Sequence, residues 1–189
     1  MRIILASASP RRREILKGLN VDFEIIVSNA DESSDKTDAG ELCMELSKIK
    51  AQSVAKELND KDALIIGCDT VVVKDGKILG KPKNRDDAFN MIKFLQNDEH
   101  SVISGLTLIY SDKIISAFEE TKVVFDKMST QEIQAYVDTG ECDDKAGGYA
   151  IQGLAAPYIK GIDGCYYNVV GLPVNLLKNM AKNLGVSIF

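Results

Sequence analysis

The sequence predicts an α/β fold in which helices pack on a mixed β-sheet. Short apolar runs of strand length alternate with segments of helical periodicity along the whole chain. With 189 residues, 45% of them hydrophobic, the chain can bury a substantial core. No repeat, low-complexity linker or change of composition interrupts it, so we predict a single domain over residues 1–189.

In the first half of the chain, apolar runs and helical periodicity define each expected element. These elements are a strand at 2–6, a helix at 10–19, a strand at 22–27, an acidic loop at 28–40, a helix at 41–58, and strands at 63–68 and 71–73. Residues 74–77 have the chemistry of a hairpin turn, which returns the chain into a strand at 78–79.

The second half begins with a predicted helix at 85–96 and a long hairpin, with strands at 101–110 and 113–125. Ser129 and Glu132 have the spacing of a capping box, which predicts a helix running to residue 138. In the glycine-rich region that follows, short strands are expected at 149–152, 158–160 and 166–170. Pro173 then begins a terminal helix.

Composition limits the classes of partner. The chain has 28 acidic and 23 basic residues, and its net charge of −5 disfavours nucleic acid and anionic membranes as partners.

The single histidine, His100, belongs to no recognisable triad, so we expect a surface or hydrogen-bonded histidine. The wide spacing of the four cysteines, Cys43, Cys68, Cys142 and Cys165, predicts free thiols. No signal peptide or membrane span is evident, so we expect a cytoplasmic protein.

The segment from Ser7 to Arg13 is the first candidate binding site. Ser9 can cap a helix that Pro10 starts, which leaves unpaired backbone N–H groups at its end. Consecutive arginines at 11–13 oppose the helix dipole there, so a bound phosphate would explain them. A solvated basic turn is the alternative. The glycines of a Walker loop or a dinucleotide fingerprint are absent.

Acidic residues supply the second candidate site. Asp69 directly follows an apolar strand, where a carboxylate can bind a divalent cation or accept a proton from water. A turn-forming aspartate is the alternative. Asp31, Glu32 and Asp35 lie in the acidic loop and can supply another metal ligand, although a solvated loop explains them equally.

Two lysines and a glutamine complete the candidates. Lys50 falls between apolar Leu46 and Val54 on its predicted helix, so it must snorkel or point into a polar site. Lys81 lies between glycine and proline, where a stiff backbone can aim its ammonium group. Gln152 offers a donor and an acceptor together, as recognition of a pyrimidine edge requires, although a glycine-rich loop leading into a strand explains its segment equally. Each lysine alone is more often structural.

Four motifs occur in order along the chain. They are LASASPRR at 5–12, GCDTV at 67–71, GKP at 80–82, and DKAG at 144–147 with IQG at 151–153. A closing segment, IDGCYYNVVGLP at 162–173, follows them. This combination resembles the Maf family of nucleoside triphosphate pyrophosphatases, the septum formation proteins. The resemblance spans nearly the whole chain, and the ordered set is specific although each motif alone is weak.

The resemblance implies hydrolysis of a nucleoside triphosphate between its α- and β-phosphates with a divalent cation, Mg²⁺ or Mn²⁺. Lys145 and Gln152 are similar to the dTTP/UTP branch rather than the 7-methyl-GTP branch. The expected substrates are therefore dTTP and UTP, with modified pyrimidine nucleotides as further candidates, and the expected role is cleansing of the nucleotide pool.

The resemblance also implies a role for individual residues. Asp69 would be the catalytic proton acceptor and a metal ligand, with Glu32 as a second acid near the metal. The implied specificity residues are Arg11, Thr70 and Gln152. The residues expected around the phosphates or the base are Ser7, Arg12, Lys50, Lys81 and Lys145.

The implied fold is an elongated mixed β-sheet flanked by helices, with two lobes around a nucleotide-binding cleft, the Maf/Ham1 or ITPase-like fold. A homodimer is the quaternary structure that the family suggests. The chain departs from the family pattern at Cys142, usually proline, at Gly148, usually alanine, and at Ala150, usually glycine. Ala150 would restrict the backbone beside Gln152 if that position requires a positive φ.

Two other functions use the same features. The first is a purine pyrophosphatase acting on ITP or XTP, which shares the architecture and the product. The second is a nucleotide-binding regulator of cell division without significant turnover. A nucleic-acid-binding module, indicated only by the arginines at 11–13, is disfavoured by the net charge.

Overall fold

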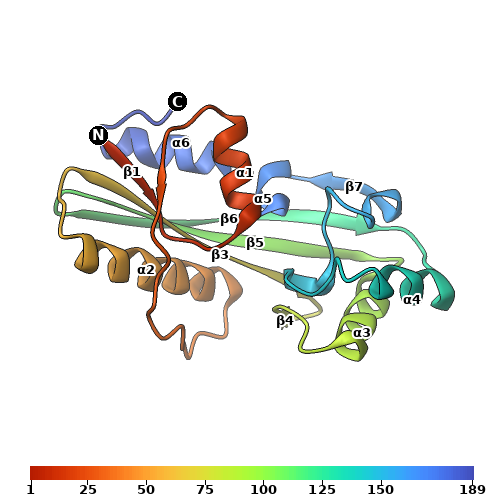
Figure 1. Cartoon of the computed structure of the whole chain (residues 1–189). Coiled ribbons are helices and arrows are strands. Elements are labelled where there is room, and N and C mark those ends of the chain that lie inside the picture. The colour runs from red at the N-terminus through yellow and green to blue at the C-terminus, as the bar shows by residue number, and fades with distance from the viewer. The chain divides into compact units, whose positions relative to one another are not determined.

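The structure is a computed structural model that describes residues 1–189. Strands and helices alternate along the chain, as predicted (Figure 1). The strands are β1 (Arg2–Leu5), β2 (Glu24–Ile25), β3 (Ala63–Lys74), β4 (Lys77–Leu79), β5 (Glu99–Tyr110), β6 (Lys113–Phe125) and β7 (Ile159–Asp163). The helices are α1 (Pro10–Gly18), α2 (Ala39–Leu58), α3 (Arg85–Leu95), α4 (Thr130–Asp138), α5 (Tyr166–Val170) and α6 (Val174–Asn183). Short 3₁₀ turns occur at Ala146–Gly148 and Ala156–Tyr158.

The seven strands form one mixed sheet. Its order is β2-β1-β3-β5-β6-β7, and β4 pairs with β3. β1 is parallel to both β2 and β3, whereas β4 is antiparallel to β3 and β7 is antiparallel to β6. A strand with parallel neighbours on both sides is covered on both faces, which explains the uninterrupted apolar run Ile3, Ile4 and Leu5 in β1.

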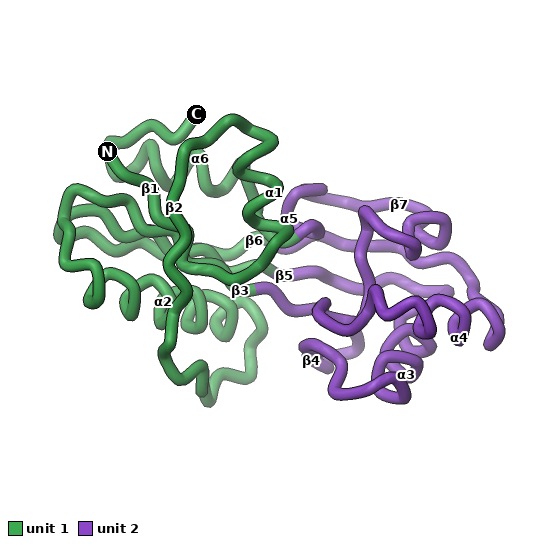
Figure 2. The backbone as a smooth tube through the Cα atoms, viewed as in Figure 1, with its two compact units in different colours: residues 1–69, 104–119, 171–189 green, residues 70–103, 120–170 purple.

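The chain divides into two compact units, each built from separate segments (Figure 2). Unit 1 comprises residues 1–69, 104–119 and 171–189, and unit 2 comprises residues 70–103 and 120–170. The strands β3, β5 and β6 each contribute residues to both units. The division therefore follows no single linker in the sequence.

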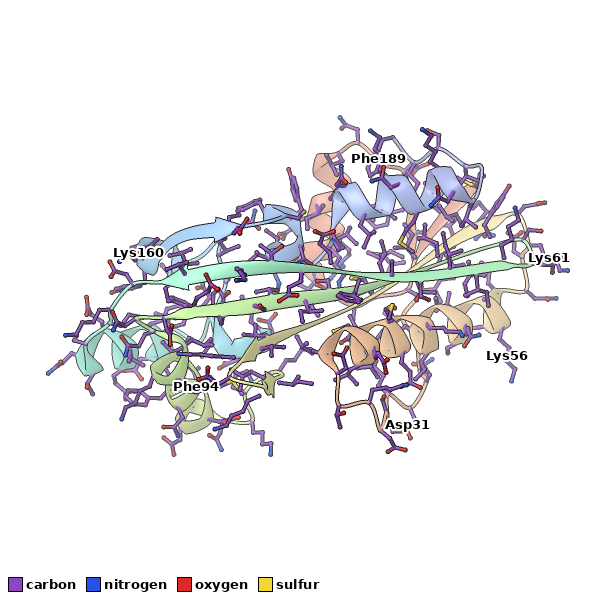
Figure 3. The ribbon with its side chains drawn as sticks, turned by 180° about the vertical axis from the view of Figure 1, so that it is seen from behind. Asp31, Lys56, Lys61, Phe94, Lys160 and Phe189 are labelled. Carbon is purple, nitrogen blue, oxygen red and sulfur yellow. The ribbon has the colours of Figure 1, made fainter.

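Unit 1 has helices on both faces of its strands. Figure 1 and Figure 3 show α2 on one face and α6 on the other. The buried cluster on the α2 side contains Ile4, Ala6, Ala51, Val54, Ala63, Ile65 and Ile109. Side chains alternate along a strand, so the fully buried Leu5 and Ile66 point away from α2.

Unit 2 packs α3 and α4 together with its own part of the sheet. The predicted capping box opens α4: the Ser129 hydroxyl accepts the Glu132 N–H at 3.2 Å, and the Glu132 carboxylate accepts the Ser129 N–H at 2.7 Å. The core of this unit contains an aromatic group of His100, Phe125 and Tyr149, whose ring centroids lie 4.9–5.5 Å apart. His100 Nε2 is 2.7 Å from the Tyr149 hydroxyl. The histidine is thus buried rather than on the surface, and its Nδ1 has no hydrogen-bond partner.

Several sequence-based boundaries are wrong. β3 runs unbroken through Asp69 and Thr70, because β1 pairs with its first half and β4 with its end. Pairing on neighbouring strands overrides the weak strand preference of aspartate. The expected strand at 22–27 forms only at β2.

Two predicted strands in the glycine-rich region do not form. Residues 149–150 are irregular and residues 151–152 lie in a turn, because the side chain of Tyr149 is fixed in the core beside His100 and the Gly147 N–H donates to the distant Gly80 carbonyl. Residues 166–170 form α5, where buried Asn168 donates to the Val102 carbonyl and the Thr121 hydroxyl. In both segments, contacts with residues far away in the sequence determine the secondary structure, and the local sequence pattern gives no sign of these contacts.

The four cysteines are free thiols, as predicted, and three of them are buried; Cys165 is half-buried. None of the helices combines the length and apolar character needed to cross a bilayer.

Burial of His100 makes stability depend on pH. Burial and, to a smaller extent, nearby Lys74 lower the pKa of His100 to about 4, although Asp98 opposes the shift. Between its ordinary pKa of 6.5 and about 4, the unfolded chain binds a proton on this ring that the folded chain does not. The free energy of unfolding should therefore decrease by up to about 3 kcal/mol as the pH is lowered through this window.

Urea denaturation across this pH range, on the wild type and His100→Gln, measures the effect. The glutamine variant should lose this part of the pH dependence. Equal pH dependence in the two proteins would contradict a buried neutral imidazole.

Candidate active site

The turn after β1 carries Ser7 and leads into α1. Ser9 occupies the N-cap position and Pro10 the first turn, but the Ser9 side chain makes no capping hydrogen bond. The Ser9 N–H instead donates to the Ser7 hydroxyl at 3.2 Å. Ser9 is therefore the N-cap residue, as predicted, but its side chain satisfies no N–H group of the first turn.

Arg12 is buried at the base of this turn, with only 8% of its surface exposed. Its Nε donates to the Gly171 carbonyl at 2.8 Å, and its Nη1 donates to the Ser7 hydroxyl oxygen at 3.0 Å. Because this oxygen accepts hydrogen bonds from both Arg12 and Ser9, its own O–H must donate elsewhere. A phosphate oxygen is a suitable acceptor for that hydrogen.

Arg11 and Arg13, on either side of Arg12, are half-buried. The first turn of α1 contains no acidic residue, so nothing in this turn balances the positive charge at the end of the helix. The segment can therefore attract an anion.

Lys50 joins two carboxylates of unit 1. Its Nζ lies 2.5 Å from Asp69 Oδ1 and 3.0 Å from Glu32 Oε2. The lysine and aspartate side chains are only 12% and 16% exposed, whereas the Glu32 side chain is 44% exposed. Lys50 thus points into a polar site, one of the two outcomes predicted for it. A single ammonium balances only one of the two carboxylates, so the group retains a negative charge.

Close packing of α2 on β3 sets this geometry. A Cβ atom on Gly67 would lie 2.2 Å from the Ser47 carbonyl oxygen and 2.9 Å from the Ala51 Cβ. Because strand side chains alternate, Asp69 faces the same side of the sheet as Gly67, toward α2. The turn of α2 that touches Gly67 is also the turn that carries Lys50, so the glycine brings lysine and aspartate together.

Asp69 lies in the middle of β3, not at the carboxyl end of a strand as expected. The strand continues because it gains β4 as a partner beyond the end of β1. The Oδ1 atom of Asp69 is paired with Lys50, whereas no hydrogen bond from the protein reaches Oδ2. That second oxygen is available to accept a proton or to bind a cation.

The Gly171 carbonyl contacts both Arg12, after β1, and Cys68, in β3, and this role was not predicted from the sequence. This oxygen accepts the Arg12 Nε hydrogen bond and also lies 3.4 Å from the Cys68 sulfur, next to Asp69 in β3. The only signal in the sequence was its position in the closing motif. A backbone oxygen carries no residue-type signature, so the pattern could not assign it this role.

Unit 2 holds the other candidate residues. Lys145 is half-buried, and its Nζ donates to the Glu141 carbonyl at 2.6 Å and to Asp144 Oδ1 at 2.7 Å. The Gly147 N–H donates to the Gly80 carbonyl at 3.0 Å, which fixes the loop of Lys81 beside this segment.

The three remaining candidate residues of unit 2 differ in their exposure to solvent. The Lys81 and Gln152 side chains are exposed, and Gln152 lies in a turn. Thr70 is half-buried in β3, directly after Asp69. The exposed Gln152 amide keeps both its donor and its acceptor available for a ligand.

The departures from the family pattern are mild in the structure. Ala150 does not have a positive φ, so its side chain imposes no strain beside Gln152. Gly148 has a φ of 75°, which glycine adopts easily. Cys142 is buried, and this burial, together with Asp143, raises the pKa of its thiol. A buried, protonated thiol is chemically inert.

The residues present fit a divalent cation. The oxygens of Asp69 and Glu32 converge on Lys50 Nζ, and magnesium usually takes one or two carboxylates together with substrate oxygens. No group of three or more His, Cys, Asp or Glu side chains gathers for a metal anywhere in the structure. Asp31 and Asp35 are exposed loop residues, and Figure 3 shows Asp31 at the outer end of the loop before α2.

Comparison with known proteins identifies the family and the fold of this chain. The model of the Maf-like protein family matches residues 2–184. A protein of Clostridium botulinum strain Okra / Type B1 named dTTP/UTP pyrophosphatase is 51% identical, with 98% of each chain covered. A protein with the same name from Thermoanaerobacter sp. strain X514 is 50% identical, with 96% of each chain covered.

A solved structure of the Ham1 protein of Staphylococcus aureus has the same fold. It aligns over 97% of this chain and 100% of that chain, with a TM-score of 0.52 and 13% sequence identity. The expectation of a Ham1-like, mixed α/β fold is confirmed.

The close contact at Gly67 gives a test of the site. Gly67→Ala places a methyl group against the backbone of α2, so it should lower the free energy of unfolding by about 1–3 kcal/mol and displace Lys50 from Asp69. Gly18→Ala is the matched control, because no atom lies within 4 Å of its added Cβ. Denaturation curves of both variants provide the comparison. Equal stability of the two variants would show that α2 does not depend on this contact.

Proposed function

We propose that this chain, which belongs to the Maf family, hydrolyses dTTP and UTP to the nucleoside monophosphate and pyrophosphate, and so cleanses the nucleotide pool. The names of relatives about 50% identical over nearly the whole chain support the substrates. The observation in the structure that carries the proposal is the convergence of Asp69 and Glu32 on Lys50. Modified pyrimidine nucleotides are further candidate substrates.

A divalent cation, Mg²⁺ or Mn²⁺, is part of the proposal. Asp69 and Glu32 would hold it, since their carboxylates retain a negative charge after pairing with one lysine. Such an ion polarises phosphate oxygens and makes bound water more acidic. Lys50 then helps to orient Asp69, whose Oδ1 it already binds.

Asp69 is the proposed proton acceptor. Its Oδ2 receives no hydrogen bond from the protein, while the contact of Oδ1 with Lys50 fixes the carboxylate plane. A water that attacks the α-phosphorus must lose a proton, and a positioned carboxylate can accept it. The chain therefore needs no serine or cysteine nucleophile.

Basic groups are proposed to neutralise the triphosphate. Hydrolysis of this kind depends mainly on positioning and on charge stabilisation of the phosphate oxygens. In unit 1, Arg12 is held by Gly171 and presents Ser7 in a fixed orientation, so these donors need little reorganisation. The other proposed contacts are Lys50, Lys81 and Lys145.

Base selection is proposed for Gln152, with Arg11 and Thr70 as further specificity residues. The Gln152 amide can donate to a carbonyl oxygen and accept from a ring N–H, and uracil and thymine present both groups on one edge. Its exposure in a turn leaves both functions free.

The proposal also includes a homodimer in the cytoplasm. Four free thiols suit a reducing compartment. Light scattering of the purified chain measures the oligomeric state.

A panel of nucleoside triphosphates with Mg²⁺ tests the reaction. We expect pyrophosphate, without orthophosphate, from dTTP and UTP, and little turnover of the other nucleotides. Faster turnover of ITP or XTP would favour a purine pyrophosphatase. Binding without turnover would favour a nucleotide-binding regulator. Orthophosphate as the only inorganic product would overturn the assignment of the broken bond.

Asp69→Asn tests the proton acceptor. Asparagine keeps an oxygen for Lys50 but cannot accept the proton, so we expect kcat to fall by roughly 10²–10⁴ while the fold is preserved. Asp22→Asn, at an exposed position of the same unit, is the control and should keep full activity. Full activity of the Asp69 variant, measured as pyrophosphate release, would falsify the assignment.

A further inference from the structure

Glu141 lies just after α4 and binds the segment of Lys145 and Gln152 at both ends. Its backbone carbonyl accepts the Lys145 Nζ hydrogen bond at 2.6 Å. Its carboxylate accepts the Leu154 N–H, with Oε1 and Oε2 at 3.0 and 2.9 Å from the nitrogen. A single residue therefore contacts the segment at Lys145 and again at Leu154, two positions beyond Gln152.

The turn that contains Gln152 is shaped around this carboxylate. A Cβ atom on Gly153 would lie 2.0 Å from Glu141 Oε1 and 2.4 Å from its carboxyl carbon. Only glycine leaves room for the carboxylate to reach the Leu154 N–H. Because Gly153 directly follows Gln152, the contact fixes the backbone from which the amide side chain extends.

The backbone of Glu141 is held at the end of α4. Tyr136 of α4 is 4% exposed, and its pKa is raised first by burial and then by the charge of Glu141, so the carboxylate lies beside this buried phenol. The Glu141 N–H donates to the Thr139 hydroxyl at 3.2 Å. The start of α4 is fixed by its capping box. The carboxylate therefore holds the turn from a well-ordered base.

The middle of the segment has other anchors. The Tyr149 hydroxyl contacts His100 Nε2, and the Gly147 N–H donates to the Gly80 carbonyl. Loss of the Glu141 carboxylate should therefore release the turn at Gln152 without unfolding the segment. This separation makes the role of Glu141 measurable.

We propose that Glu141 is a positioning residue for base specificity: it holds Gln152 in the orientation that selects the pyrimidine base. This inference rests on the proposed function, because it assumes that Gln152 contacts the base. The role is distinct from catalysis, since Glu141 acts through the backbone at Gly153 and Leu154.

Kinetics of Glu141→Ala against the wild type test the proposal. A base contact made equally in the ground state and the transition state contributes to KM, so we expect KM for dTTP and UTP to rise about tenfold with kcat changed less than about threefold. Discrimination against other nucleotides should fall by a similar factor. Glu141→Gln keeps one acceptor oxygen and should restore most of the specificity. Glu99→Ala, at an exposed glutamate of unit 2 that pairs with Lys122, is the control.

Gly153→Ala provides an independent route to the same state. Its methyl group meets the flexible end of a side chain, so this variant should fold with the Glu141 carboxylate displaced. It should match the KM and specificity of Glu141→Ala. It also keeps the proposal testable if Glu141→Ala does not fold.

Hydrogen exchange separates failure of this inference from failure of the proposed function. Exchange of the Leu154 amide should become faster in Glu141→Ala and Gly153→Ala and stay unchanged in Glu99→Ala. If the wild type hydrolyses no nucleotide, the proposed function fails while exchange still reports on the contact. If the wild type is active and Gly153→Ala or Glu141→Ala loses the Leu154 protection but keeps its KM and base discrimination, the role of Glu141 is overturned.

Discussion

The ion pair between Lys50 and Asp69 organises the candidate site of unit 1. Both side chains are largely removed from solvent, so each charge depends on the other for compensation. Their meeting requires α2 to lie close to β3, which the absence of a side chain at Gly67 permits. Glu32, from the loop before α2, adds a second carboxylate to the same ammonium. One packing contact between a helix and a strand therefore determines the charge, the geometry and the proposed chemistry of the group.

Much of the fold could be predicted from the sequence because its signals are local. The capping box of Ser129 and Glu132, the helical periodicity of α2 and the hairpin of β5 and β6 depend on neighbouring residues, and each forms as expected. The errors occur where distant contacts decide. α5 places Asn168 against β5 and β6, and Tyr149 enters the core beside His100. Neither contact leaves a pattern within a window of ten residues.

The candidate site shows the same division. Arg12, Lys50 and Asp69 were found because charged residues next to apolar strands or on an apolar helix face are conspicuous. Their pairing was not predictable, since it depends on the spacing between α2 and β3. Glu141 was missed for another reason: it works through the Leu154 N–H, a backbone group that every residue except proline possesses. Contacts with the backbone leave no trace in residue type, except where they require a glycine such as Gly153.

The hydrogen bond from Arg12 to the Gly171 carbonyl joins residues 159 positions apart. During synthesis, the arginine leaves the ribosome long before its partner exists, because the last segment of unit 1, residues 171–189, follows all of unit 2 in the sequence. Until then, the Arg12 guanidinium lacks the backbone oxygen that helps to hold it inside the unit. Assembly of this part of the molecule thus waits for the synthesis of Gly171, so a chain that stops before this residue lacks the contact that holds Arg12.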